Sequence, residues 1–261
     1  MTPVDEWRED LAAWGLPEAI LTQAPESPWS HDPAAFAADD TIDRDSLSNL
    51  RAREGLGAGG TVLDVGCGGG RSSLGLVPPA TELIGVDASA SMLASFRESA
   101  QRLGVAAQGV EGKWPEVAGQ VSKVDVVVCH HVLYNVAEIE PFVRALHTHA
   151  RRRVVIEITT AHPQSAFAPA WWHFWAINRP TRPTAEIATE VIRSMGIDVT
   201  VEIGPRPPMA RAAADLVRQI PSLRRRLCLA SNRDPELETW LRANPIDLGD
   251  RRSATLWWDV S

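Results

Sequence analysis

The spacing of apolar residues changes its character near residue 60. Before that point, apolar positions recur every three or four residues, as they do on one face of a helix. Val4, Trp7, Leu11 and Trp14 form such a face between a Thr2-Pro3 start and a stop at Gly15. A second helical stretch is predicted for residues 46–54. The amino-terminal part of the chain is therefore predicted to be helical.

From Thr61 onward, short apolar runs alternate with helical stretches. The runs are TVLDV (61–65), ELIGVD (82–87), VAAQGV (105–110), VDVVVC (124–129), RVVIEI (153–158), IDVTVEI (197–203) and ATLWWDV (254–260). Strands that are apolar almost throughout are typical of a parallel sheet with helices on both faces. The pattern predicts an α/β fold with a doubly wound sheet and a helical amino-terminal extension.

A glycine-rich loop follows the first predicted strand, in TVLDVGCGGGRSS, where four of the five positions 66–70 are Gly. A dinucleotide fingerprint fails, because its third glycine would fall on Arg71. A phosphate loop fails as well, because no Lys follows the glycines. Asp64 stands two residues before Gly66, where it would repel a pyrophosphate but suit a ligand with an ammonium group.

A second acidic residue, Asp87, ends the next strand in LIGVDAS. A carboxylate at the end of that strand can accept hydrogen bonds from two ribose hydroxyls at once. Taken alone, these residues leave open a doubly wound fold that binds some other nucleoside.

VLDVGCGGG followed by IGVDASASML resembles the class I S-adenosylmethionine-dependent methyltransferases, over about residues 60–160. The resemblance implies a Rossmann-like sheet of seven mostly parallel strands, with the last strand antiparallel beside the fifth. It also implies S-adenosylmethionine as cofactor and methyl transfer as the activity.

The resemblance further assigns parts of the cofactor to residues. Asp64 and the loop Gly66–Gly70 would seat the methionine part, Asp87 the ribose, and Met92 the adenine. In QGVEGKWP the chain departs from the family, with Val110 where an acid is commonest and Glu111 beside it. The implied cofactor residues are Asp64, Gly66, Cys67, Gly68, Gly70, Asp87, Ala88, Met92, Glu111, Gly112, Trp114 and His130.

The acceptor should meet the methyl group at the end of the fourth strand, which continues as CHHVLYNV. The segment has neither the Pro-Pro motif of enzymes that methylate exocyclic amines nor the Pro-Cys of cytosine carbon-5 enzymes, which argues against DNA bases. His131, His130 and Tyr134 are the candidate catalytic residues, because imidazole accepts protons near neutral pH. The alternatives are that His130 contacts the cofactor through its backbone and that Tyr134 only packs.

A segment rich in tryptophan, HPQSAFAPAWWHFWAINRPTRP, follows the fifth strand. Flat aromatic walls suit a planar ring or a quaternary ammonium, and a nearby Arg suits a carboxylate. The expected acceptor is therefore aromatic or otherwise apolar. The candidate substrate residues are Trp171, Trp172, Trp175, Glu157 and Arg179. The alternative for the tryptophans is a dimer contact or an ordinary core. The alternative for Glu157 is an ion pair with one of the arginines Arg151–Arg153.

These assignments divide the chain into two parts. Residues 1–58 are expected to form a helical extension that closes over the cofactor. Residues 59–261 are expected to form the methyltransferase domain, with a cover segment at 163–183 and a helical insertion at 205–250.

The composition of the chain limits which substrates and partners are expected. The net charge of −7 argues against a nucleic-acid polymer as substrate, and no apolar run approaches the length of a membrane span. Three widely spaced cysteines and an acidic amino terminus lead us to expect a cytoplasmic protein without a signal peptide or metal. The expected substrate is a small molecule, and a homodimer stays open. The rival functions are methylation of RNA or protein, and noncatalytic binding of S-adenosylmethionine.

Overall fold

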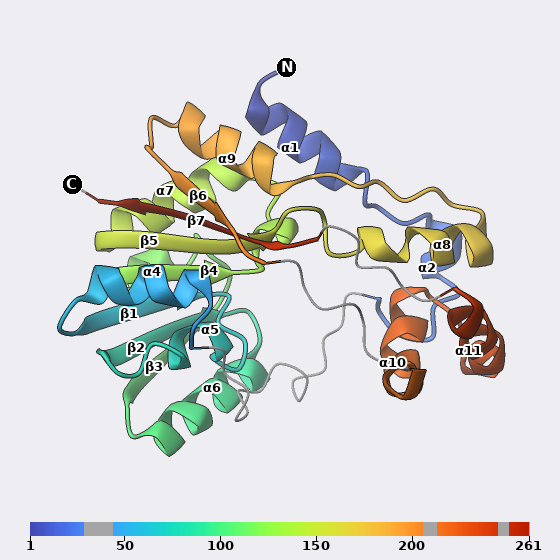
Figure 1. Ribbon diagram of the computed structural model, residues 1–261, viewed down its shortest axis with the longest axis horizontal. Helices are drawn as coiled ribbons and strands as arrows, with labels where there is room; N and C mark the ends of the chain where they lie inside the picture. The colour runs from blue at the N-terminus through green and yellow to red at the C-terminus, as the bar shows by residue number, and fades with distance from the viewer. Residues whose placement is uncertain (29–43, 206–212, 245–250, 261) are drawn as a thin grey trace.

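The computed structural model describes residues 1–28, 44–205, 213–244 and 251–260, and a seven-stranded sheet forms its centre (Figure 1). The strands are β1 (Gly60–Val65), β2 (Ala80–Asp87), β3 (Ala106–Glu111), β4 (Val124–His130), β5 (Ala150–Thr159), β6 (Thr200–Ile203) and β7 (Ser253–Asp259). Their order is β3-β2-β1-β4-β5-β7-β6. The first five strands run parallel, whereas β7 runs antiparallel to both β5 and β6. The predicted fold class is confirmed.

The strand order reverses direction at β1, which has β2 on one side and β4 on the other. In open α/β sheets, ligands bind beyond the carboxyl ends of the strands at this switch point. The β4–β5 register pairs His130 with Glu157, so the residues that follow both strands meet at the same edge. The topology thus brings the glycine loop, the two histidines and Glu157 to one end of the sheet.

Helices cover both faces of the sheet and one of its ends. They are α1 (Pro3–Ala12), α2 (Glu18–Leu21), α4 (Leu47–Leu56), α5 (Arg71–Leu74), α6 (Ala90–Leu103), α7 (Ile139–His149), α8 (Ala168–Trp175), α9 (Ala185–Ser194), α10 (Ala213–Arg226) and α11 (Asp234–Ala243). Single 3₁₀ turns lie at η1 (Ala118–Gln120), η2 (Leu133–Asn135), η3 (Ser165–Phe167) and η4 (Ser231–Arg233). The longest described helices, α6 and α10, are too short and too polar to span a bilayer.

Alternate strand residues enter two separate cores. Val126 and Val128 pack with α4, α5 and α6 on one face, whereas Val127 and Cys129 pack with α1, α7 and α9 on the other. Successive side chains of a strand point to opposite faces, so strands buried on both faces must be apolar at every position. The continuous apolar runs in the sequence follow from this double burial.

Helix α1 begins where the sequence predicts. The Thr2 hydroxyl accepts a hydrogen bond from the Asp5 amide, and the Asp5 carboxylate accepts one from the Thr2 amide. The predicted apolar face is confirmed, since Trp7 is fully buried and its Nε1 donates to the Val136 carbonyl oxygen over 2.7 Å. The helix packs on α9 and α7. The proposed closure of residues 1–58 over the cofactor stays a prediction.

A third core lies beyond the carboxyl end of β5, at the right of Figure 1. It joins α2, α8, α10 and α11 and includes Trp171 and Phe174, both buried. We call this part the helical lobe. The predicted helical insertion (205–250) contributes α10 and α11 to it, and residues 206–212 and 245–250 of that insertion lie outside the described residues.

The sixth strand is shorter than its apolar pattern predicts. The amide of Val199 donates to the carbonyl oxygen of Ile197 over 3.0 Å, which turns the backbone before pairing with β7 begins at Thr200. Val199 is nevertheless buried. Its apolar character therefore reflects packing of a turn against the core and not membership of the strand.

Candidate functional site

The glycine loop between β1 and α5 has a backbone conformation that disfavours any residue other than Gly. Gly66, Gly68 and Gly70 have φ angles of 72°, 51° and 91°, in the left-handed region. A Cβ on Gly66 would lie 2.3 Å from Cγ2 of Val132, and one on Gly70 would lie 2.7 Å from the Phe96 ring. The loop thus packs closely against the segment after β4 and against α6.

Asp64 lies fully buried beneath this loop. Its Oδ2 accepts hydrogen bonds from the hydroxyls of Ser72 (2.7 Å) and Ser73 (2.6 Å), while its Oδ1 accepts none from the described residues. Burial raises the pKa of this carboxyl to about 6, although the two serines oppose the shift. A buried acceptor without a donor indicates that another group donates to it when the site is filled. An ammonium group of a ligand or an ordered water would fit this position.

Asp87 connects the end of β2 with the glycine loop. Its Oδ2 accepts from the Gly68 amide and its Oδ1 from the Ser89 amide, each over 2.9 Å. Each carboxylate oxygen can accept a further hydrogen bond. The side chain is therefore held in place by the backbone and can still bind two neighbouring hydroxyls.

The residues assigned to the adenine lie at the ends of β2 and β3. Met92 is buried in the first turn of α6, and Glu111 is exposed and pairs in register with Asp87. The Gly112 amide donates to the Asp87 carbonyl oxygen over 3.0 Å. Trp114 packs in the core, where its Nε1 donates to the Phe142 carbonyl oxygen over 3.3 Å.

His131 and Glu157 form a pair at the ends of β4 and β5. Nε2 of His131 lies 3.0 Å from Oε1 of Glu157, and the His131 amide donates to the Glu157 carbonyl oxygen over 2.7 Å. His131 has a φ of 59°, which is rare for residues other than Gly and recurs at functional sites. The His131 side chain is 50% exposed, against 13% for Glu157. One ring edge is thus fixed by the carboxylate while part of the ring stays accessible.

Glu157 is ionised over the whole physiological range. Burial raises its pKa, but hydrogen bonds from His131 and Ser48 and the nearby His130 outweigh burial and lower it to about 2. The interpretation that Glu157 pairs with Arg151–Arg153 is wrong, because Arg153 lies four residues away toward the other end of β5. Its guanidinium binds the Asp259 carboxylate on β7 over 2.8 Å.

His130 and Tyr134 occupy positions less suited to proton transfer. Burial lowers the pKa of His130 to about 4, and its Nε2 accepts or donates no hydrogen bond among the described residues. The Tyr134 hydroxyl donates to the Thr159 carbonyl oxygen (2.5 Å) and accepts from the Thr159 amide (2.8 Å). Burial raises the pKa of Tyr134 to about 12. These contacts leave His131 as the candidate base with an accessible ring.

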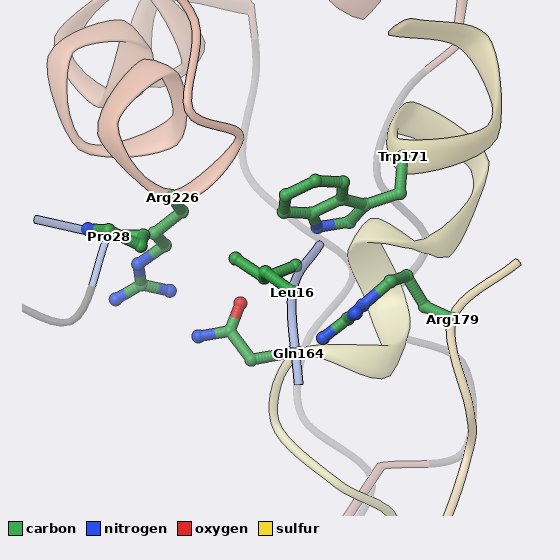
Figure 2. A pocket seen from close by; sticks show the side chains of 6 residues that line it. All are labelled: Leu16, Pro28, Gln164, Trp171, Arg179 and Arg226. Atoms are coloured by element: carbon green, nitrogen blue, oxygen red, sulfur yellow. The ribbon is translucent and has the colours of Figure 1, made fainter. Parts of the chain in front are cut away.

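The predicted substrate residues of the Trp-rich segment separate in space. Trp171 is buried in the helical lobe, Trp175 donates from Nε1 to the Leu227 carbonyl oxygen over 2.7 Å, and Trp172 is 57% exposed. Trp171 and Arg179 also line a small hollow (Figure 2), together with Leu16, Pro28, Gln164 and Arg226. The predicted cover over the acceptor stays a prediction.

Two residues absent from the sequence-based site also line this end of the molecule. Ser48 donates to Glu157, and Arg226 lines the hollow from the end of α10. Neither lies near a recognisable motif, so no sequence signal marks them. Among the described residues, no three His, Cys, Asp or Glu side chains come together in a way that could hold a metal ion.

Part of the chain is similar in sequence to known methyltransferases. A family model described as "Methyltransferase domain" matches residues 62–153. Over 96 residues the chain is 31% identical to a ubiquinone biosynthesis O-methyltransferase of Azorhizobium caulinodans, a match that covers 37% of this chain and 36% of that protein. The chain thus aligns with only about a third of the length of this relative.

Solved structures share the fold over most of the chain. A magnesium protoporphyrin IX methyltransferase from Synechocystis with bound S-adenosylhomocysteine aligns with a TM-score of 0.53 at 16% identity, over 87% of this chain and 91% of that one. A putative methyltransferase from Bacillus halodurans aligns with a TM-score of 0.54 at 15% identity, over 82% and 97%. At these identities the similarity concerns the fold.

Proposed function

Since this chain contains a class I S-adenosylmethionine-dependent methyltransferase domain, we propose that it transfers the cofactor's methyl group to an oxygen, nitrogen or carbon atom of a small molecule. The observation that carries the proposal is the contact between His131 and Glu157 at the same sheet edge as the glycine loop and Asp87. This contact supports a base at the end of the sheet where we propose that the cofactor binds.

S-adenosylmethionine is the cofactor of this family, and the residues present fit it. Asp64 offers a buried acceptor for the ammonium group, and Asp87 offers its carboxylate to the ribose hydroxyls. Met92 and Glu111 stand at the ends of the strands that would flank the adenine. When bound, the cofactor supplies an activated sulfonium methyl, so the protein contributes mainly positioning and proton removal.

Proton removal is the role that we assign to His131. With Nε2–H donating to Glu157, the lone pair of Nδ1 is free to take a proton from a hydroxyl or amine of the acceptor. Glu157 holds the ring in this tautomer and orientation. Nδ1 would take the proton of the acceptor hydroxyl or amine, and Glu157 would stabilise the imidazolium that forms.

The rival functions make different demands. An enzyme that modifies RNA or protein would need a surface suited to a polymer, and the net charge of −7 disfavours RNA. A noncatalytic binder would have no use for a histidine held by an ionised carboxylate. We therefore favour a small, aromatic or otherwise apolar acceptor, which the tryptophans of α8 also support.

Calorimetry and a methyl-transfer assay test the proposal. We expect the chain to bind S-adenosylhomocysteine and not NAD, and to transfer labelled methyl groups to at least one member of a panel of small phenols, amines and carboxylic acids. Binding of NAD without a response to S-adenosylhomocysteine would contradict the cofactor assignment. Cofactor binding with no turnover of any panel member would favour the noncatalytic binder.

The base assignment has its own test. His131→Gln should lower kcat by about 10²–10⁴-fold while S-adenosylhomocysteine binds with unchanged affinity. Glu157→Gln should lower kcat less and shift the pH profile, because the ring keeps its basic nitrogen and loses its fixed orientation. His173→Gln, at an exposed position of α8, is the matched control. Full activity in His131→Gln would assign the base elsewhere.

A further inference from the structure

The Glu157 carboxylate is held by two different elements, one at each of its oxygens. Ser48, the second residue of α4, is fully buried, and its hydroxyl donates to Oε2 of Glu157. Oε1 faces the His131 ring, with 3.0 Å between Nε2 and Oε1. The Ser253 hydroxyl lies 3.4 Å from the same Oε1. The oxygen that His131 does not use is therefore bound by a helix of the amino-terminal part of the chain.

The charge of Glu157 fixes the direction of the hydrogen bonds that lead to it. An ionised carboxylate only accepts, so the Ser48 hydroxyl proton must point at Oε2. The Ser46 Oγ lies 3.1 Å from the Ser48 Oγ, so Ser46 is the donor of this second pair. The Ser46 oxygen in turn accepts from the Asn49 amide over 3.3 Å, as the N-cap of α4. A chain of hydrogen bonds with one direction runs from the start of α4 to the carboxylate.

The position of this serine hydroxyl does not depend on the carboxylate. Helix α4 packs on β4, β5 and β7, and its Leu56 is fully buried. The Arg51 guanidinium binds the Glu202 carboxylate of β6, with 2.6 Å between Nη2 and Oε1. Arg153 of β5 donates from Nη1 to the Arg51 carbonyl oxygen over 3.0 Å. These contacts hold the helix on the sheet whether or not the Ser48 hydroxyl is present.

The backbone fixes the two strand ends but not the plane of the carboxylate. The His131 amide donates to the Glu157 carbonyl oxygen over 2.7 Å, and His130 pairs with Glu157 in the β4–β5 register. The terminal torsion of a Glu side chain is broad, so these backbone contacts leave the carboxylate able to turn. The Glu157 side chain is largely buried, which limits the water that could replace a lost donor. Ser48 thus supplies a constraint that the strands do not.

We propose that Ser48 is a positioning residue for methyl transfer. By holding Oε2 of Glu157 it aims Oε1 at His131, and so keeps the imidazole in the orientation in which Nδ1 can take a proton. The inference rests on the proposed function for the role of His131. Ser48 acts through Glu157 and has no contact with acceptor or cofactor in this scheme. Helix α4 would then complete the catalytic pair, although it precedes the first strand.

A double-mutant cycle with the full chain tests this role. The assay is transfer of labelled methyl groups from S-adenosylmethionine to an acceptor from the panel of small phenols, amines and carboxylic acids. Ser48→Ala should lower kcat by about three- to tenfold, the effect of one lost hydrogen bond, with KM for S-adenosylmethionine unchanged. In Glu157→Gln, which already lacks the carboxylate, the same substitution should have no further effect on kcat. A purely structural role of Ser48 would lower kcat equally in both backgrounds.

Ser99→Ala is the matched control for the loss of a buried serine hydroxyl. Ser99 is buried on α6, where its Oγ accepts from Nη2 of Arg102 over 2.8 Å. This substitution should leave kcat at the wild-type value in both backgrounds. All variants should bind S-adenosylhomocysteine with the wild-type affinity, as calorimetry measures.

Proton NMR gives a second readout that needs no acceptor. A histidine N–H that donates to a carboxylate gives a signal far downfield, and His131→Gln identifies the signal of His131. With S-adenosylhomocysteine bound, we expect this signal in the wild-type chain and in Ser99→Ala. In Ser48→Ala its exchange with water should be at least about fivefold faster, because the carboxylate is no longer held in place.

The outcomes separate this inference from the proposed function. Wild-type kcat in Ser48→Ala, or equal effects of Ser48→Ala in the two backgrounds, would overturn the positioning role even if S-adenosylhomocysteine binds normally. If no panel member is methylated, the NMR signal decides, and equal exchange in the wild-type chain and Ser48→Ala would overturn the role. A wild-type chain that does not bind S-adenosylhomocysteine would instead overturn the proposed function.

Discussion

The Asp87 carboxylate holds the glycine loop through the Gly68 amide and is the group that we propose binds the ribose of the cofactor. We predict that Asp87→Ala weakens binding of S-adenosylhomocysteine by about 1–3 kcal/mol, the range for a lost charge-assisted hydrogen-bond pair. Calorimetry measures the change. Glu82→Ala, at an exposed position of the same strand, should leave the affinity unchanged. Equal affinity in both variants would mean that the ribose is held elsewhere.

Buried histidines make the stability of the protein depend on pH in the mildly acidic range. The pKa of His162 falls to about 3 and that of His130 to about 4, mainly because of burial, against an ordinary value of 6.5. Because the pKa of each histidine is lower in the folded than in the unfolded chain, their contribution to stability is complete above pH 6.5. It is lost as the pH falls toward the folded-state pKa values. Asp64, with a raised pKa of about 6, acts in the opposite direction.

We predict that the free energy of unfolding decreases as the pH falls from 6.5 to 4.5. In His162→Gln the slope should be shallower by up to about 1.4 kcal/mol per pH unit, the effect of one proton. Urea unfolding at several pH values measures it. A slope identical to wild type would show that His162 titrates normally in the folded chain.

At the level of elements, the site depends on contact between the loop after β1 and the loop after β4. Gly66 has a φ of 72° and stands where a Cβ would lie 2.3 Å from Val132, the residue that follows His131. Gly104, with a φ of 69° at the end of α6, has open space around the same position. The two glycines therefore separate backbone strain from steric overlap.

We predict that Gly66→Ala lowers the free energy of unfolding by roughly 2–4 kcal/mol and abolishes binding of S-adenosylhomocysteine, because strain and overlap add. Gly104→Ala should cost only about 1 kcal/mol and keep full affinity. Chemical unfolding and calorimetry on the pair measure both effects. Similar losses in both variants would mean that the left-handed backbone alone accounts for the requirement.

For the whole molecule, the helical lobe has a core separate from the two cores of the sheet. Leu237 of α11 is fully buried in the lobe, and Leu146 of α7 is fully buried against the sheet. Smaller cores bury less apolar surface and open at lower free energy. The lobe is thus the part of the molecule in which we expect opening to be easiest.

Hydrogen exchange should therefore report two levels of protection. We predict that Leu237→Ala accelerates exchange in α8 and α11 by an amount equivalent to about 2–5 kcal/mol and leaves β1 and β4 nearly unchanged. Leu146→Ala should instead accelerate exchange in the sheet. Uniform acceleration throughout the chain by Leu237→Ala would mean that lobe and sheet unfold as one unit.

The sequence by itself determined the order of the elements and the place of the glycine loop between the first strand and the helix that follows. Apolar runs mark the central strands because strands buried on both faces need apolar residues at every position, and the φ angles of the glycine loop need Gly at fixed spacing. Asp64 and Asp87 can also be identified from the sequence, because each stands in a local motif at or near the end of a strand. The starts of two strands depart clearly from the apolar pattern: β5 begins at Ala150, three residues before its run, and β6 begins at Thr200, three residues after the start of its run.

Only the tertiary structure decided how the candidate catalytic and substrate residues are arranged. The pairing of His131 with Glu157 depends on the β4–β5 register, and the two residues are far apart in the chain. Trp171, Trp172 and Trp175 share one short helix, yet which of them is buried depends on where α10 and α11 pack. Contacts between distant segments leave no local periodicity, so the sequence names such residues as candidates and packing assigns their roles.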